Sequence, residues 1–316
     1  MSELYPYPPD PAQFYRPTVV QRLPQYLPLP PSPTREKLSF KRLLLHFVLL
    51  ALTALTTTVM GALFLNDGTS RIVSGLLYSV SLLMILGSHE MGHYIACRWY
   101  GVDATLPFFI PQPPLLVPGT FGAFIRMKSP VPSRRALFDI GLAGPLAGFI
   151  VMVPVAFAGL LTLQHQVVAP GSAGITFNDP LLFRLIGWAF RIDLESGVAN
   201  SFYLAAWFGA LVTALNLMPV GQLDGGHGTF SVFGQRAHWW ISRVAFATMA
   251  IISVLGWFWH RSPSGFVYVI LLAVLLRVRH PEPQQMEPLG TARIIVAVVT
   301  ALVFALCFLP FPITIT

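Results

Sequence analysis

Two histidines separated by three residues, with a glutamate next to the first, are the residues of this sequence best suited to catalysis. The segment reads GSHEMGH over residues 87–93 and contains His89, Glu90 and His93. In an α-helix this spacing places both imidazoles on one face, about one turn apart, where both can bind a single Zn²⁺ ion. Glu90 then lies beside the ion without binding it, in the position of a general base for zinc-activated water. The spacing therefore predicts a catalytic zinc site.

A catalytic zinc ion usually has three protein ligands and one open position, so a third ligand is needed. Residues 216–227 read NLMPVGQLDGGH, and Pro219 with the glycines predicts a break in a membrane helix. Irregular backbone within a membrane is tolerated only beside protein or a water-filled cavity. We predict Asp224, held on that irregular backbone, as the third ligand, although Asp before glycines is also typical of an ordinary turn. Competing candidates are His227, Asp139 and Asp103.

Asn216 and His46 are two further polar residues within apolar segments. Asn216 precedes Asp224 by eight residues, about two helical turns, so its amide could enter the same cavity and stabilise an oxyanion. The alternative role is an interhelical hydrogen bond, which is common for Asn in membrane bundles. His46 stands near the start of an apolar segment, where it could support the metal ligands from behind, but a histidine that snorkels to the membrane surface is the expected role.

The elements that must hold these residues are apolar segments long enough to cross a bilayer. Only 10% of the 316 residues are charged, whereas a soluble domain has roughly 25%. Six runs of about 20 apolar residues are present, and a seventh at 264–276 is short enough to be re-entrant instead. We therefore predict an all-α polytopic membrane protein with about six or seven transmembrane helices. The six longer runs are 43–65, 72–97, 140–163, 199–220, 239–259 and 291–310.

The positive charges of the loops predict the orientation of the chain. If the N-terminal region is cytoplasmic and all seven segments cross, most Lys and Arg residues lie on the cytoplasmic side, as membrane insertion favours. The N-terminus and the active site are then expected on the cytoplasmic side of a cell membrane, either plasma or inner. The net charge of +7 does not indicate nucleic-acid binding, because the basic residues are scattered and form no basic helix. The lipid bilayer is the expected partner.

Three regions are expected not to cross the membrane. Residues 101–137 are proline-rich and then rich in β-forming residues, which predicts a membrane-associated β-hairpin or loop between the second and third helices. Residues 164–198 form a loop on the other side with an amphipathic segment at 181–190. Residues 1–34 contain ten of the 28 prolines, which predicts a disordered cytoplasmic tail. The predicted divisions are this tail, a membrane-embedded core at 35–230 and C-terminal transmembrane helices at 231–316.

Four motifs together resemble the site-2 proteases, which are intramembrane zinc metalloproteases that cleave transmembrane segments of their substrates. The first motif is HEMGH at 89–93, and the last runs from NLMP at 216–219 into LDGG at 223–226. Between them lie GTFGAFIR at 119–126 and FDIGLAGPLAG at 138–148. Each motif alone is only moderately specific, whereas all four in this order are specific. The resemblance covers about 72–230.

The resemblance implies a metalloprotease core with one zinc ion and a set of functional residues. It also implies an active site below the cytoplasmic surface, reached by water, and a membrane-protein substrate with a transmembrane helix. The chain resembles a minimal form, because neither the loop at 164–198 nor the end of the chain has room for the peptide-binding or regulatory domains of other members. The implied roles are zinc ligation by His89, His93 and Asp224, base and acid catalysis by Glu90, and assistance to the transition state by Asn216.

Two other functions fit part of this pattern. A membrane metal transporter, or a non-proteolytic zinc-binding membrane protein, would use His89, His93 and Asp224 as a transit site, but transport does not require Glu90. A different membrane metalloprotease that trims lipidated proteins shares the two histidines and the glutamate. The segment from Asn216 to Asp224 and the glycine-containing hairpin fit that protease less well.

Overall fold

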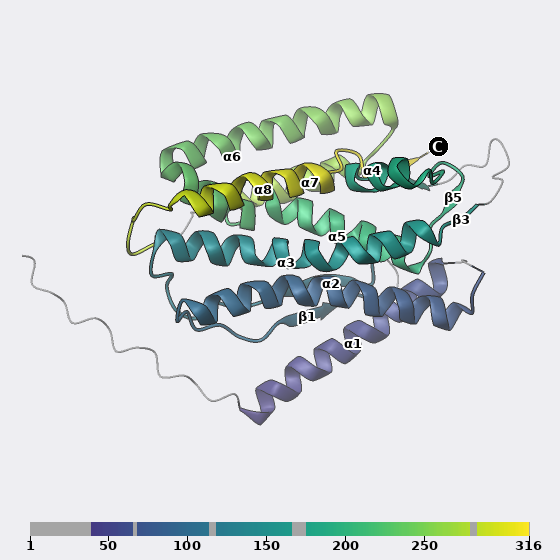
Figure 1. Cartoon of the computed structure of the whole chain (residues 1–316), viewed down its shortest axis with the longest axis horizontal. Helices are drawn as coiled ribbons and strands as arrows, with labels where there is room; N and C mark the ends of the chain where they lie inside the picture. Colours follow the sequence, from purple (N-terminus) through teal and green to yellow (C-terminus); the bar gives the residue numbers. More distant parts are fainter. Residues whose placement is uncertain (1–38, 66–67, 114–117, 166–174, 279–282, 316) are drawn as a thin grey trace, which may run out of the picture. The chain divides into compact units, whose positions relative to one another are not determined.

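The computed structural model describes residues 39–65, 68–113, 118–165, 175–278 and 283–315, within one compact unit, Lys37–Thr316. The predicted tail at 1–34 lies outside the described residues. The described chain is mostly helical (Figure 1). Its helices are α1 (Phe40–Phe64), α2 (Arg71–Trp99), α3 (Arg134–Leu161), α4 (Leu181–Phe190), α5 (Ser201–Leu217), α6 (Asp224–His260), α7 (Ser264–Leu275) and α8 (Thr291–Cys307).

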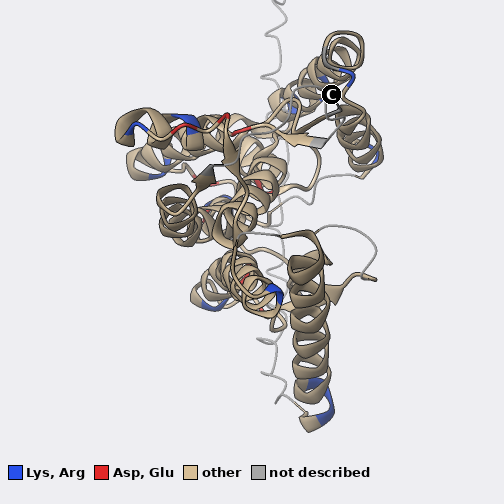
Figure 2. Ribbon diagram, turned by 90° about the vertical axis from the view of Figure 1, so that its right-hand side faces the viewer, with Lys and Arg blue, Asp and Glu red and all other residues tan. Residues whose placement is uncertain are grey.

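Four of the described helices are long and apolar enough to cross a membrane, namely α1, α2, α3 and most of α6. Each of these helices contains an apolar stretch with few charged residues, and charged residues occupy only short parts of the ribbon as a whole (Figure 2). The chain is therefore a mostly helical, polytopic membrane protein. The apolar helices α5, α7 and α8 are shorter. A helix of 17 residues, the length of α5 and α8, rises about 26 Å, against a bilayer core of about 30 Å. The count of six or seven spans stays a prediction.

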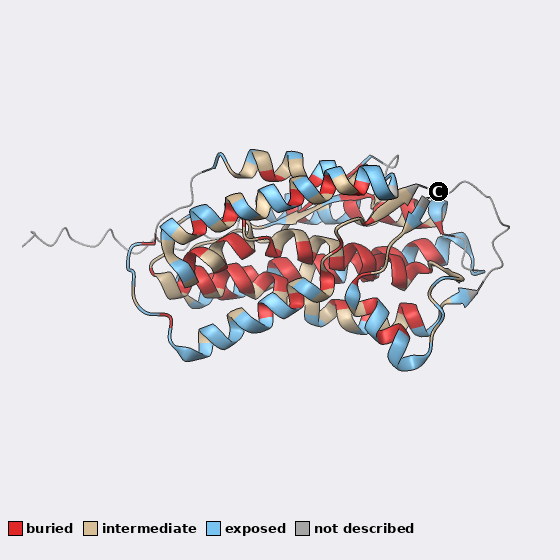
Figure 3. Cartoon of the chain, turned by 90° about the horizontal axis from the view of Figure 1, so that it is seen from above, coloured by how far each residue is buried: buried red, intermediate tan, exposed pale blue. Residues whose placement is uncertain are grey.

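Helices α2 and α3 form the centre of the packing, with α1, α5 and α6 against them. Buried residues gather on the inner helices and exposed ones on the outer helices (Figure 3). The backbones of α2 and α3 approach closely because glycine lies at their contact. A Cβ atom on Gly92 would stand 2.4 Å from the carbonyl oxygen of Ala143. Any larger residue at that position would push the two helices apart.

The chain between α5 and α6 contains the predicted helix break. Helix α5 ends at Leu217 and α6 begins at Asp224, and Gly221 in the turn between them has φ +54°, which glycine adopts at little cost. The expectation that Asp224 lies on irregular backbone was wrong, because Asp224 is the first residue of α6. The next residue, Gly225, is helical, and a Cβ there would stand 2.0 Å from the Leu217 carbonyl oxygen. Glycine at 225 therefore serves close packing rather than helix breaking.

Two short antiparallel strands, β1 (Phe108–Pro111) and β2 (Thr120–Phe124), lie in sequence between α2 and α3. This β1–β2 hairpin is hydrogen-bonded to both α1 and α2. The Thr56 hydroxyl donates to the Gly119 carbonyl at 2.8 Å, and the Tyr78 hydroxyl of α2 donates to the Pro118 carbonyl at 3.0 Å. The association of the hairpin with a membrane stays a prediction.

His46 differs from its prediction. It is buried, its Nδ1 lies 3.1 Å from the Pro107 carbonyl oxygen, and its ring centroid lies 4.0 Å from that of Phe108. A histidine with these partners does not snorkel to a membrane surface. It holds the start of the β1–β2 hairpin against α1 instead.

The region after α3 contains two further strand pairs and a short helix. Helix α4 has the bounds predicted for the amphipathic segment, with Phe183 and Ile186 buried and Leu185 and Trp188 exposed. Strand β3 (Gln164–His165) pairs with β5 (Gly197–Val198), and β4 (Ile175–Phe177) pairs with β6 (Ile313–Ile315) near the end of the chain.

Candidate metal centre

Helix α2 presents two histidines and a glutamate to the interior of the bundle. His89 is 3% exposed and Glu90 and His93 are 8% exposed. Ionisable side chains at such burial within an apolar helix are costly unless they are paired or bound. Their burial therefore indicates that these three residues serve a function.

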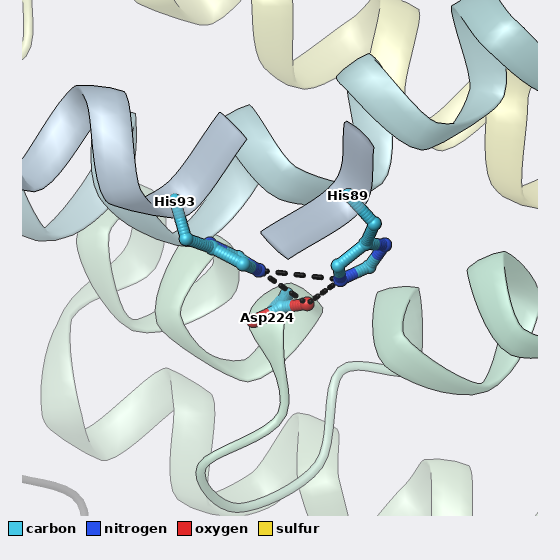
Figure 4. A group of neighbouring side chains, drawn as sticks. All are labelled: His89, His93 and Asp224. Carbon is cyan, nitrogen blue, oxygen red and sulfur yellow. Dashed lines mark hydrogen bonds and ion pairs between the residues drawn. The ribbon is translucent and has the colours of Figure 1, made fainter. Parts of the chain in front are cut away.

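Asp224 completes a cluster with the two histidines (Figure 4). Its Oδ2 atom lies 3.3 Å from Nε2 of His89 and 3.3 Å from Nε2 of His93, and the two Nε2 atoms are 3.2 Å apart. The structure thus joins the middle of α2 to the start of α6. Among the residues that the structure describes, this is the one group of three or more His, Cys, Asp or Glu side chains that could hold a metal ion.

The atoms that converge in this cluster are suitable ligands for a zinc ion. Nδ1 of His93 lies 2.7 Å from the Ile140 carbonyl oxygen, so Nδ1 carries the proton and Nε2 presents its lone pair to the cluster. A carboxylate oxygen and two imidazole nitrogens at this separation are stabilised by a metal ion or a proton between them. Two imidazoles and one carboxylate are a known ligand set of catalytic zinc sites with one open position.

Glu90 lies beside the cluster but is not one of the three residues whose ligand atoms converge. Its carboxylate accepts a hydrogen bond from the backbone N–H of Ile125, and it interacts electrostatically with His93 and Asp224. Ile125 directly follows strand β2. The β1–β2 hairpin therefore contacts the residue predicted as the general base.

Asn216 also reaches the cluster, from the last turn of α5. Its Nδ2 atom lies 3.2 Å from Nε2 of His89. An amide group is thus available next to the converging donors, as the spacing to Asp224 predicts.

None of the competing third ligands belongs to the group of converging side chains. The backbone of Gly141 in α3 faces the side chain of His227, since a Cβ on Gly141 would stand 2.7 Å from Cβ of His227. Asp139 binds Arg293 at 2.6 Å, and Asp103 pairs with Arg98 at 3.9 Å. The structure therefore brings Asp224, and none of these three, into the cluster.

Sequence reasoning missed the role of small residues in α3. A Cβ atom on Gly144 would stand 2.1 Å from Nε2 of His93, and one on Gly148 would stand 3.1 Å from Cβ of His89. The run of small residues at 141–148 is, by its composition, typical of close helix packing. Its spacing of four between Gly144 and Gly148, equal to that of the two histidines, is the signal that could have shown that they make room for the imidazoles.

The fold and the cluster define a class, a polytopic membrane protein with an internal His–His–Asp centre and an adjacent glutamate. The sequence model of Peptidase family M50 matches residues 77–256, more than half of the chain, and the chain belongs to that family. This match confirms the resemblance to the site-2 proteases.

Curated relatives carry related names. The chain is 30% identical over 222 residues to the "probable zinc metalloprotease EGY2, chloroplastic" of Arabidopsis thaliana, a match that covers 67% of this chain and 37% of the relative. It is 31% identical over 247 residues to the "probable zinc metalloprotease EGY1, chloroplastic" of Oryza sativa subsp. japonica, covering 75% and 41%. The chain thus spans about two fifths of the length of these relatives. No solved structure matches the chain significantly.

Proposed function

We propose that the chain is an intramembrane zinc metalloendopeptidase that hydrolyses peptide bonds within or near transmembrane segments of membrane proteins. The observation that carries the proposal is the convergence of ligand atoms from the buried His89 and His93 and the partly buried Asp224, with Glu90 beside them, between helices that can cross a membrane. Membership of Peptidase family M50 and the names of the curated relatives support it.

The chain's own residues would divide the chemistry as follows. His89, His93 and Asp224 would hold zinc, which supplies Lewis-acid polarisation and acidifies water when bound. Glu90 removes a proton from the attacking water and delivers a proton to the departing amine as the C–N bond breaks. Asn216 donates from its amide to the oxyanion that develops on the scissile carbonyl. The Ile125 N–H holds the Glu90 carboxylate in place.

We also propose that the β1–β2 hairpin lies at the membrane edge and binds the substrate. A peptide bond inside a membrane helix is shielded by helical hydrogen bonds, so the substrate must unwind before it is cleaved. An extended segment can regain backbone partners by pairing with a strand. The contact between Ile125 and Glu90 supports this role, because it brings the end of β2 to the base. A simple cap that excludes lipid is the alternative.

The finer topology is proposed on charge grounds. Six or seven spans, with the N-terminus and the active site on the cytoplasmic side of a plasma or inner membrane, put most Lys and Arg on one side. The relatives are named chloroplastic, so the compartment needs a direct test. Labelling of single cysteines introduced before α1 and after α8, in sealed cells, would decide the orientation. The division into 1–34, 35–230 and 231–316 is part of the same proposal.

The test of the activity is Glu90→Gln in the full chain, expressed with a single-span membrane substrate. We expect cleavage to be abolished while the bound zinc is retained, because Glu90 is not among the converging ligands. Glu195→Gln is the matched control, since Glu195 is exposed in the loop before α5. Full cleavage by the Glu90 variant would refute the proposal. Zinc flux into liposomes by the purified chain, without peptidase activity, would favour a metal transporter instead.

A further inference from the structure

Arg293 of α8 connects α8 to the start of α3 and to the end of α2 through hydrogen bonds. Its Nε donates to Oδ1 of Asp139 at 2.9 Å and its Nη2 donates to Oδ2 of Asp139 at 2.6 Å. The same Nη2 donates to the Tyr100 hydroxyl at 3.0 Å, and that hydroxyl donates to Asp139. Asp139 belongs to α3, and Tyr100 is the residue that directly follows α2. A bidentate guanidinium fixes both the distance and the orientation of its carboxylate partner.

The residue after Asp139 is the one that orients His93. The Ile140 carbonyl oxygen lies 2.7 Å from Nδ1 of His93, and the next turn of α3 presents Gly144 to the same imidazole ring. Partners of this kind fix the tautomer and the ring orientation of a metal-binding histidine. A shift in the first turns of α3 would therefore move the hydrogen bond that directs Nε2 of His93 toward the cluster.

Helix α8 lies outside residues 77–256, which the family matches, so Arg293 is not part of the matched region. The start of α3 has a second tie to the segment before α8, because Arg135 Nε donates to the Pro288 carbonyl at 2.8 Å. Arg135 also approaches Glu287 at 3.6 Å, and its side chain is 40% exposed. Arg293 and Arg135 thus both connect the first turns of α3 to α8 or to the segment before it. Only Arg293 binds Asp139, the residue next to Ile140.

We propose that Arg293 is a positioning residue for the metal centre, which acts through Asp139 on the Ile140 carbonyl that orients His93. The inference rests on the proposed metal site. It predicts that loss of Arg293 weakens metal binding itself, whereas a purely structural tie would lower thermal stability and leave the affinity of the folded protein unchanged.

The experiment measures Co²⁺ binding to the purified, metal-free full chain, by competition with a chelating dye and by the visible absorption of bound Co²⁺. Arg293→Gln is expected to weaken Co²⁺ binding about tenfold, the lower end of the range for such supporting partners, and to shift the absorption bands. Arg293→Lys, which keeps the charge without the fork, is expected to give an intermediate loss. Asp139→Asn and the double variant Asp139→Asn/Arg293→Gln are expected to match Arg293→Gln, because the pair acts as one unit.

Arg135→Gln is the matched control and is expected to bind Co²⁺ within about twofold of the natural chain, since exposed ion pairs contribute little. Unchanged Co²⁺ affinity and absorption in Arg293→Gln, or an equal loss in Arg135→Gln, would overturn the inference. If Arg293→Gln does not fold, Arg293→Lys and Asp139→Asn decide the question by the same criteria. A chain that binds Co²⁺ through His93 but cleaves no membrane substrate would refute the proposed function and leave this inference standing.

Discussion

The side-chain amide nitrogen of Asn216 lies 3.2 Å from Nε2 of His89, although 127 positions separate the two residues in sequence. The contact joins the last turn of α5 to the middle of α2. A metal ion on Nε2 of His89 would occupy the lone pair that faces this amide, which leaves the amide hydrogens available to a substrate oxygen. This contact supports the proposal that Asn216 donates a hydrogen bond to substrate and is not a ligand.

Asn216→Ala should lower kcat for cleavage by about 100-fold or more, the usual effect of removing one oxyanion donor. The zinc content should stay at about one ion per chain, because Asn216 is outside the three converging ligands. The measurement combines single-substrate kinetics with elemental analysis of the purified variant. Loss of zinc together with activity would show that Asn216 supports the ligands instead, and an unchanged kcat would exclude any role in the transition state.

Substitution of His93 and of His227 should distinguish a zinc ligand from a histidine that only lies near the site. His93→Ala should abolish stoichiometric zinc binding, because it removes one of the three converging atoms. His227→Gln, on the adjoining turn of α6, should retain about one zinc ion per chain, since His227 is not in the group of converging side chains. Removal of zinc from the natural chain by a chelator should abolish cleavage, and added zinc should restore it. Loss of zinc in the His227→Gln variant would show instead that His227 is a zinc ligand.

The part of the site that lies on one helix could be predicted from the sequence, and the part that depends on tertiary packing could not. His89 and His93 are four residues apart, and helical geometry alone puts them on one face. The contact between Arg293 and Asp139 spans 154 positions, and no local pattern indicates it. Asp224 could be selected by residue type, but its place at the start of α6 depends on how Gly225 packs against the end of α5.

The same distinction holds for the fold. The segment at 181–190 was predicted with its observed bounds, because its apolar residues follow a helical period. The interruption of α6 at Gly234, where φ is 81° and ψ is 174°, has no signal beyond a glycine in an otherwise helical pattern. The burial of His46 against Pro107 depends on where the hairpin docks on α1, which composition does not specify.

Asp179, in the loop before α4, should make stability depend on pH. Burial raises the pKa of this carboxyl above its ordinary value of 3.8, so the folded chain binds the proton more tightly than the unfolded chain. Stability is then greatest below the ordinary pKa and falls as pH rises through the raised one. Asp179→Asn keeps an acceptor for the Tyr203 hydroxyl without this charge. The thermal midpoint of the natural chain, relative to the variant, should fall with rising pH; a difference that is constant or rises would contradict the assignment.

Gly144→Ala should abolish metal binding without unfolding the chain. The added Cβ would stand 2.1 Å from Nε2 of His93, so the imidazole must leave the cluster, whereas alanine itself is favourable in a helix. Gly87→Ala is the matched control two residues before His89, because its Cβ would meet only Phe109 at 3.6 Å, an ordinary contact. We expect the control to keep its zinc and its activity. Helix content by circular dichroism and zinc by elemental analysis measure the two effects separately, and full zinc occupancy in the Gly144 variant would show that His93 is not a ligand.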